Sequence, residues 1–114
     1  MAETSARDPV DMLPLTPALF HVLLSLADGD KHGYAILKEV ESRTDGEVVL
    51  STGTLYGIVK RLLSDGLIRE AASLSDERRT AYRLTPFGRK VALAEAERLR
   101  ALVATARKLL QEPA

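Results

Sequence analysis

The hydrophobic pattern of this chain changes its period at Gly66. Before that glycine, apolar residues recur at intervals of three and four, which is the spacing of amphipathic helices. After it come two short runs with the pattern of strands. A chain of 114 residues is long enough for one hydrophobic core and too short for two. The sequence therefore predicts one mainly α domain with a small β-hairpin.

Three helices are predicted in the first part of the chain. The first begins with Thr16 as N-cap and Pro17 at the first helical position, and the turn signal "ADGD" ends it. The second lies in "KHGYAILKEVESRTDG" and ends at Gly46. Ser51 or Thr52 caps the third helix. Its apolar residues follow the template of an amphipathic helix, namely Leu55, Ile58, Val59, Leu62 and Leu63.

Two strands and a long helix complete the prediction. The strands are expected over residues 67–72 and 80–84, joined by the polar loop "SLSDERR". The last helix repeats the Thr-Pro start, with Thr85 and Pro86, and runs to about Gln111. Three helices followed by a β-hairpin is the order of a winged helix-turn-helix. The expected organisation is a flexible tail over residues 1–12, a winged helix-turn-helix over residues 13–85 and a C-terminal dimerisation helix over residues 86–112.

Two apolar surfaces are larger than one small core can cover. The first helix is apolar almost all round, which favours a dimer contact through Leu19, Phe20 and Leu23. The last helix carries a coiled-coil seam with alternating steps of four and three, namely Ala92, Ala96, Leu99, Val103, Ala106 and Leu110. Because this seam is nearly three heptads long and follows the compact unit, dimerisation is the favoured interpretation. The alternative is that the helix folds back onto its own domain.

The outward face of the third helix is unusually slim. It contains Gly53, Tyr56, Gly57, Lys60 and Ser64, and a glycine inside a helix costs about 1 kcal/mol relative to alanine. Two glycines on one face let a bulky partner approach, while Tyr56 and Lys60 offer a hydrogen-bonding group and a cation. These are the requirements of a helix that enters the major groove of DNA. The alternative is that Gly57 makes room for another protein element.

The N-terminus of this helix and the hairpin add groups that suit a polyanion. Hydroxyl side chains that can bind phosphate oxygens stand at the helix start, namely Ser51, Thr52 and Thr54. The formal net charge is zero, but residues 1–50 hold four basic and nine acidic residues, and residues 51–114 hold twelve and seven. Residues 76–90 alone hold five basic and two acidic residues. A basic hairpin beside such a helix is typical of a wing that contacts DNA.

Three family-like motifs occur in order, "HGYAILKEV", "STGTLYGIVKRLLSDGLI" and "RRTAYRLTPFGRK". Over about residues 15–90 the chain thus resembles the PadR family of bacterial transcriptional regulators. That family carries a His-Gly-Tyr start to the second helix, Gly-Thr-Leu-Tyr in the recognition helix and an Arg-Arg-x-x-Tyr-x-Leu-Thr-type wing strand. The resemblance implies a homodimer that binds a palindromic operator in double-stranded DNA, usually as a repressor, and leaves it when a small-molecule effector binds.

The resemblance also implies which residues lie near DNA. The matching positions are Tyr34, Ser51, Thr52, Gly53, Thr54, Tyr56 and Lys60, with Arg78, Arg79 and Thr80 in the wing. The chain looks like the short branch of the family, in which one C-terminal helix completes the dimer with the first helix. It has no tryptophan, on which some relatives stack flat aromatic drugs, so the identity of the effector stays open.

Other function classes are disfavoured. No cysteine is present, which excludes disulfides and thiolate metal sites, and neither a metal nor a cofactor is expected. Enzymatic activity is not expected, because His21 and His32 have no acid partner at an informative spacing. No apolar run is long enough to span a bilayer, so we expect a cytoplasmic protein without a membrane partner. The alternative function is a winged helix that binds protein without DNA, and such a domain would not need the cations of the third helix and the wing.

Overall fold

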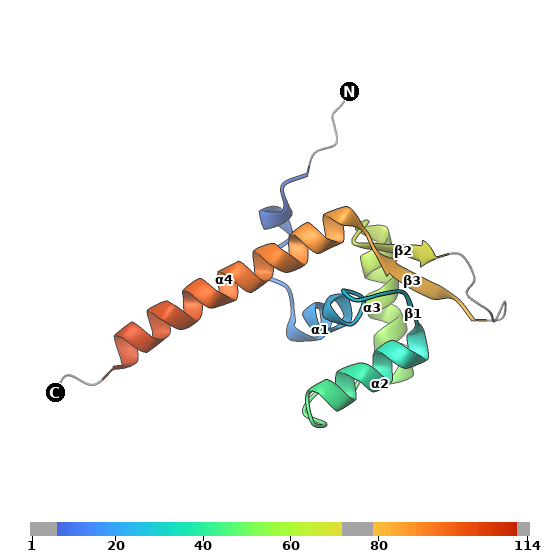
Figure 1. Ribbon diagram of the computed structural model, residues 1–114, viewed down its shortest axis with the longest axis horizontal. Helices are drawn as coiled ribbons and strands as arrows, with labels where there is room; N and C mark the ends of the chain where they lie inside the picture. Colours follow the sequence, from blue (N-terminus) through green and yellow to red (C-terminus); the bar gives the residue numbers. More distant parts are fainter. Residues whose placement is uncertain (1–6, 72–78, 112–114) are drawn as a thin grey trace.

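The computed structural model describes residues 7–71 and 79–111, which form a compact helical domain with one helix projecting from it (Figure 1). In chain order the elements are η1 (Pro9–Met12, a 3₁₀ helix), α1 (Pro17–Ser25), β1 (Lys31–His32), α2 (Gly33–Arg43), α3 (Thr52–Ser64), β2 (Ile68–Ala71), β3 (Ala81–Leu84) and α4 (Pro86–Leu110). The described part of the chain excludes residues 1–6, 72–78 and 112–114. Most of the expected hairpin loop and the last residue of the predicted C-terminal helix, at position 112, therefore lie outside it.

Local signals set the predicted helix ends. Thr16, Ser51 and Thr85 act as N-caps, and each hydroxyl oxygen accepts a hydrogen bond from the N–H group three residues ahead, at 2.9–3.2 Å. Gly66 has φ +75°, a left-handed conformation that closes the turn after α3. The predicted starts of α1, α3 and α4 and the predicted end of α3 therefore agree with the structure. Two ends come earlier than predicted, since α1 ends at Ser25, just before "ADGD", and α2 ends at Arg43, before Gly46.

The sheet has three antiparallel strands in the order β1-β3-β2, where the sequence predicts only the β2–β3 hairpin. In the third strand, β1, Lys31 pairs with Tyr82 and His32 pairs with Ala81. Two residues are too few to show a period, so β1 left no pattern in the sequence. Its pairing covers the edge of β3 that the hairpin alone would leave open.

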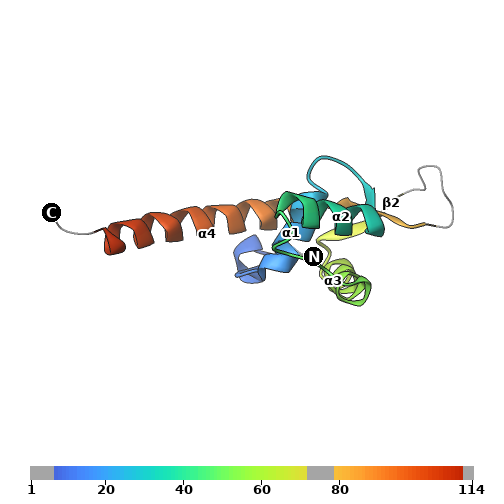
Figure 2. The same cartoon turned by 90° about the horizontal axis from the view of Figure 1, so that it is seen from below.

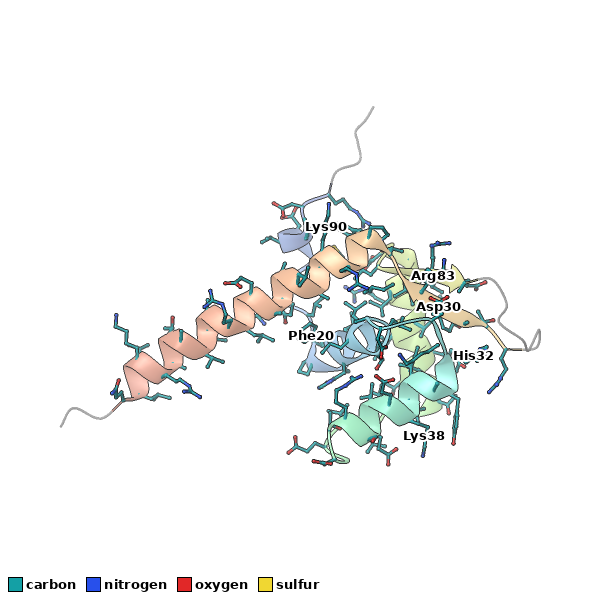
Figure 3. All side chains as sticks on the ribbon, in the orientation of Figure 1. Phe20, Asp30, His32, Lys38, Arg83 and Lys90 are labelled. Atoms are coloured by element: carbon teal, nitrogen blue, oxygen red, sulfur yellow. The ribbon has the colours of Figure 1, made fainter. Side chains whose placement is uncertain are left out.

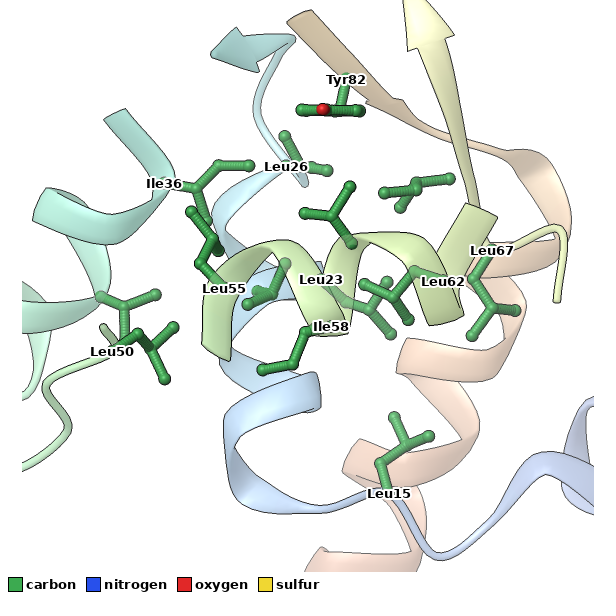
Figure 4. Packing of buried hydrophobic residues seen from close by; sticks show 14 of the residues in the cluster. Leu15, Leu23, Leu26, Ile36, Leu50, Leu55, Ile58, Leu62, Leu67 and Tyr82 are labelled. Atoms are coloured by element: carbon green, nitrogen blue, oxygen red, sulfur yellow. The ribbon is translucent and has the colours of Figure 1, made fainter. Parts of the chain in front are cut away.

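The core lies between the three helices of the domain and the sheet (Figure 4). It draws on α1, α2, α3, β2, β3 and the first half of α4, with Leu23, Ile36, Leu55, Leu62, Ile68, Tyr82 and Val91 all 6% exposed or less. The prediction that Leu23 lies on a dimer surface was wrong. Its side chain is 0% exposed, because α1 packs against both α2 and α4.

The expected flexible tail is also wrong for its second half. Residues 9–12 form η1, whose start is capped by the Asp8 carboxylate accepting from the Val10 N–H at 3.0 Å. This helix packs against α4. Arg7 donates to the Asp65 carbonyl oxygen at 2.7 Å, and its guanidinium lies 4.3 Å from the centre of the Phe87 ring. These tertiary contacts give order to a segment with no hydrophobic period of its own.

The second half of α4 extends away from the domain (Figures 1 and 2). Val91 and Glu95 are buried, whereas residues 100–111 are exposed apart from the half-buried Ala106. The alternative that this helix folds back onto its own domain therefore does not hold beyond Leu99.

A close backbone contact joins the start of α4 to the start of the hairpin. Gly88 is buried against the carbonyl oxygen of Leu67, and a Cβ atom at Gly88 would overlap that oxygen. The same carbonyl accepts the Thr85 N–H at 3.1 Å, and the Thr85 hydroxyl donates to the Gly66 carbonyl at 2.7 Å. Because the obstructing atom belongs to the backbone, it has little room to move.

We expect Gly88→Ala to destabilise the domain by about 2 kcal/mol through overpacking against this carbonyl, measured as the free energy of unfolding in urea. Gly53→Ala is the matched control, since a Cβ atom there would meet none of the described atoms within 4 Å. The control should be as stable as the wild type or slightly more stable. Equal stability of Gly88→Ala and wild type would contradict the contact.

Candidate nucleic-acid interface

One face of α3 is buried and the opposite face is open. The buried residues are Leu55, Ile58, Val59 and Leu62. The outward residues Gly53, Tyr56, Gly57, Lys60 and Ser64, which we call the glycine face, are all exposed. A Cβ atom built at Gly53 or Gly57 would meet no described atom within 4 Å. Within the described part of this chain, Gly57 therefore makes room for no other element.

The hydroxyl groups at the start of α3 form a short chain of hydrogen bonds. Ser51 Oγ accepts from the Thr54 N–H at 3.0 Å and donates to Thr54 Oγ1 at 2.9 Å. Both hydrogen bonds of the Ser51 hydroxyl are therefore made to Thr54, so that this hydroxyl caps α3 and orients the Thr54 side chain. Thr52 and Thr54 are exposed beside it.

The base of the wing meets the helices at a surface pocket of about 220 Å³. Its lining comes from α2, α3 and the sheet, namely His32, Gly33, Tyr34, Tyr56, Arg79, Thr80 and Tyr82. Burial raises the pKa of the Tyr82 hydroxyl, and the nearby Tyr56 raises it further. Tyr34, Arg79 and Thr80 are exposed, so three residues implied by the resemblance reach the surface beside the glycine face. Arg78 lies outside the described residues.

An ion pair ties the wing to the loop that follows α1 (Figure 3). Arg83 donates from Nε to Asp30 Oδ1 at 3.0 Å and from Nη2 to Oδ2 at 2.7 Å. The hydrogen bond from Arg83 holds the pKa of the Asp30 carboxyl below its usual value. Arg69 stands opposite Arg83 across the β2–β3 ladder, so Asp30 also offsets a like-charge pair.

Two of the five basic residues counted in segment 76–90 therefore make hydrogen bonds within the domain. Arg83 binds Asp30, and Arg89 donates to the Ala27 carbonyl oxygen at 3.0 Å. Sequence reasoning missed Asp30, because nothing in the local pattern relates it to a residue 53 positions away.

A second, apolar surface runs along α1 and α4. Leu19 and Phe20 are half-buried, as are Ala92, Leu99 and Ala106 of the predicted seam. Ala96, Val103 and Leu110 are exposed. A groove of about 430 Å³ separates the two helices, and its lining includes Phe20, Leu24 and Leu99. Three further exposed leucines flank the seam and were not predicted, namely Leu93, Leu102 and Leu109.

A buried carboxylate lies at the edge of this groove. Glu95 is 2% exposed and accepts hydrogen bonds from Arg98, with Nε–Oε1 2.7 Å and Nη2–Oε2 2.9 Å. It also accepts from the Leu15 N–H at 3.3 Å. The Arg98 hydrogen bonds lower the pKa of the Glu95 carboxyl. The ionised form therefore ties α4 to the segment before α1.

In the described residues, no helix is both long and apolar enough to cross a membrane. Residues 22–94 match the Transcriptional regulator PadR-like family. The chain belongs to this family. Its members are transcriptional regulators and not enzymes, so this PadR-type chain is a transcriptional regulator, and the resemblance predicted from the motifs is confirmed. The family acts by binding DNA, which disfavours a protein-binding module without DNA.

Individual relatives agree with this placement. Transcriptional regulator Rv3488 of Mycobacterium tuberculosis is 41% identical over 91 residues, which is 79% of each chain. A 37.1 kDa protein in transposon TN4556 of Streptomyces fradiae is 39% identical over 75 residues, or 66% of this chain, but the match spans only 21% of that protein. A transcriptional regulator from Clostridium thermocellum has a similar structure, with a TM-score of 0.71, 31% identity and coverage of 82% of this chain and 92% of that one. The predicted winged-helix fold is confirmed by this likeness.

The Glu95 contacts predict a pH-dependent contribution to stability. The pKa of Glu95 is lowered by folding, so the stabilisation is present above the unfolded value of about 4.3 and is lost as the pH falls through the folded value. At pH 7 we expect Glu95→Gln to lower the unfolding free energy by about 2 kcal/mol.

The difference between Glu95→Gln and wild type should shrink as the pH falls below the unfolded value, because protonation of Glu95 then favours the unfolded state; urea unfolding at each pH measures it. Glu97→Gln is the matched control, because Glu97 makes the same i,i+3 pair with Arg100 on the exposed side of α4. We expect almost no effect from it. A Glu95→Gln deficit that is unchanged at pH 3 would show that the charge is not responsible.

Proposed function

We propose that this regulator is a homodimer that binds a palindromic operator with α3 in the major groove. The observation that carries the proposal is the glycine face of α3, exposed and without Cβ atoms at two positions. A major groove about 12 Å wide admits one helix, and the base edges lie at its floor. A helix that is slim on one side brings its backbone and neighbouring side chains closer to those edges.

Polar groups around the glycine face supply the contacts in this proposal. Lys60 binds a phosphate, and Tyr56 reaches into the groove with a hydroxyl group. Thr54, oriented by Ser51, and Thr52 bind phosphate oxygens at the helix N-terminus. The remaining contacts come from Tyr34 of α2 and from the wing, namely Arg78, Arg79 and Thr80. Phosphate contacts fix the position of the helix, and its contacts to base edges select the sequence.

The second copy binds through α1 and α4. Val103 and Leu110 of the seam are 51% and 78% exposed, and they lie on a helix that leaves its own domain. Pairing of the seam residues Ala92, Ala96, Leu99, Val103, Ala106 and Leu110 with a second copy, together with Leu19 and Phe20, covers this apolar stripe. Leu102 and Leu109 widen the stripe on one side.

The regulatory outcome we propose is repression in the cytoplasm, with release of the operator when a small-molecule effector binds. The groove between α1 and α4 offers an apolar space for such a molecule. It lies on the dimerisation surface, so a molecule bound there can change the distance between the two α3 helices. Two such helices should meet half-sites about 34 Å apart, one turn of DNA.

The test uses duplexes that the wild-type protein selects from a random library. We expect an inverted repeat to be enriched, and we expect Gly57→Leu to bind that repeat about 100-fold more weakly, or about 2.7 kcal/mol. The added side chain would hold α3 away from the base edges. Leucine is the better helix former, so thermal stability should not fall.

Ala104→Leu is the control for added bulk, because Ala104 is exposed on α4 off the seam. It should bind the selected duplex like the wild type. Wild-type affinity of Gly57→Leu would refute the placement of α3 in the groove. A library in which the wild-type dimer enriches no duplex would refute DNA binding by this surface.

Dimerisation has a separate test. The variant carries aspartate at both Val103 and Leu110, which places charges in the seam and leaves the core unchanged because both positions are exposed. Light scattering should give the monomer mass of 12.4 kDa for this variant and twice that mass for the wild type. Ala104→Asp, which adds one charge off the seam, should remain dimeric. A dimer that persists in the double variant would remove the seam from the interface.

A further inference from the structure

At Gly33 the space that a side chain would occupy is taken by the side chain of Tyr56. It is the first residue of α2 and is buried. A Cβ atom at Gly33 would lie 2.5 Å from Tyr56 Oη, 2.9 Å from Cζ and 3.2 Å from Cε1. Such distances are shorter than normal van der Waals contacts, so the Tyr56 ring lies where an alanine methyl group would be.

Backbone conformation does not account for this glycine. The glycines with positive φ are Gly29, Gly46 and Gly66, and Gly33 is not among them. Its backbone is compatible with alanine, which has the higher helix propensity. Space for Tyr56 is therefore the reason for glycine at this position.

The Tyr56 side chain joins three parts of the domain. It starts on α3, lies against the first residue of α2 and helps to line the pocket that also contains Arg79, Thr80 and Tyr82. It is still 46% exposed. One part of the ring is thus held by the protein, and another part stays accessible on the surface that carries the glycine face.

The contact at Gly33 differs from the contact at Gly88 in what would move. At Gly88 the obstructing atom is a backbone carbonyl oxygen, whereas at Gly33 it is the end of a side chain that can rotate. A methyl group at Gly33 would therefore displace the Tyr56 ring and leave the fold in place.

We propose that Gly33 is a positioning residue for DNA binding: it forms a notch that holds the Tyr56 ring and so sets where the Tyr56 hydroxyl meets the operator. This inference rests on the proposed function. According to this inference, the glycine of the "HGY" segment affects DNA binding through Tyr56 of α3, and makes no contact with DNA from α2.

A double-mutant cycle tests the notch, with the duplex selected by the wild-type protein as the probe. We expect Gly33→Ala to weaken binding about 10-fold, or about 1.4 kcal/mol. In a Tyr56→Ala background, the same substitution should have no further effect, because the side chain that it displaces is gone. An equal loss in both backgrounds, or wild-type binding by Gly33→Ala, would overturn the proposal.

A second readout needs no DNA. The chain has three tyrosines, Tyr34, Tyr56 and Tyr82, so ring-labelled tyrosine gives a simple NMR spectrum in which Tyr56→Ala identifies the Tyr56 signal. Gly33→Ala should shift that signal, whereas Ala35→Ser, at an exposed position in the same turn of α2, should not. An unshifted Tyr56 signal in Gly33→Ala would also overturn the proposal.

These two readouts separate the notch from the proposed function. If the wild type enriches no duplex, DNA binding fails while the NMR shift still tests the contact between Gly33 and Tyr56. If Gly33→Ala does not fold, the Gly33→Ala/Tyr56→Ala protein should fold, because the collision is removed. Failure of both to fold would assign Gly33 to the core and refute the inference.

Discussion

The inner face of α3 is buried by residues from the rest of the domain, and this burial determines where its outer face points. Leu55, Ile58 and Leu62 pack among side chains from α1, α2 and the start of the hairpin, and each contributes about 2 kcal/mol by leaving water. A helix fixed along one side presents the opposite side at a constant orientation. The glycine face, the hydroxyl groups at the helix start and Lys60 all depend on that orientation.

Glycine serves three different purposes in this small domain. At Gly66 it adopts a left-handed conformation that ends a turn. At Gly88 and Gly33 it lets another part of the chain come close, a carbonyl oxygen in one case and a tyrosine ring in the other. On the glycine face, at Gly53 and Gly57, no atom of the described residues comes within 4 Å of where a Cβ atom would lie. Of these three uses of glycine, only the open positions on the glycine face indicate a partner outside the chain.

Charge is divided between holding the fold and facing outward. Arg83 and Arg89 lie in the basic part of the sequence, yet both bind acceptors in the turn region after α1. Their bonds hold the wing and α4 against that turn and so bring Arg79 and Thr80 to the pocket beside α3. Total charge in a segment therefore overstates the charge that is available to DNA, because ion pairs inside the domain use part of it.

Features that depend on neighbours a few residues apart were predictable from the amino-acid sequence. Helix caps at Thr16, Ser51 and Thr85, the buried stripe of α3 and the change from helices to strands follow from local hydrogen bonding and from hydrophobic period, and the motifs indicated the family. Three features became visible only in the folded domain, namely the pairing of β1, the place of Leu23 in the core and the ordering of η1. The same holds for the contacts of Asp30 with Arg83 and of Gly33 with Tyr56. Such contacts join residues that are distant along the chain, and they arise only when packing brings the elements together.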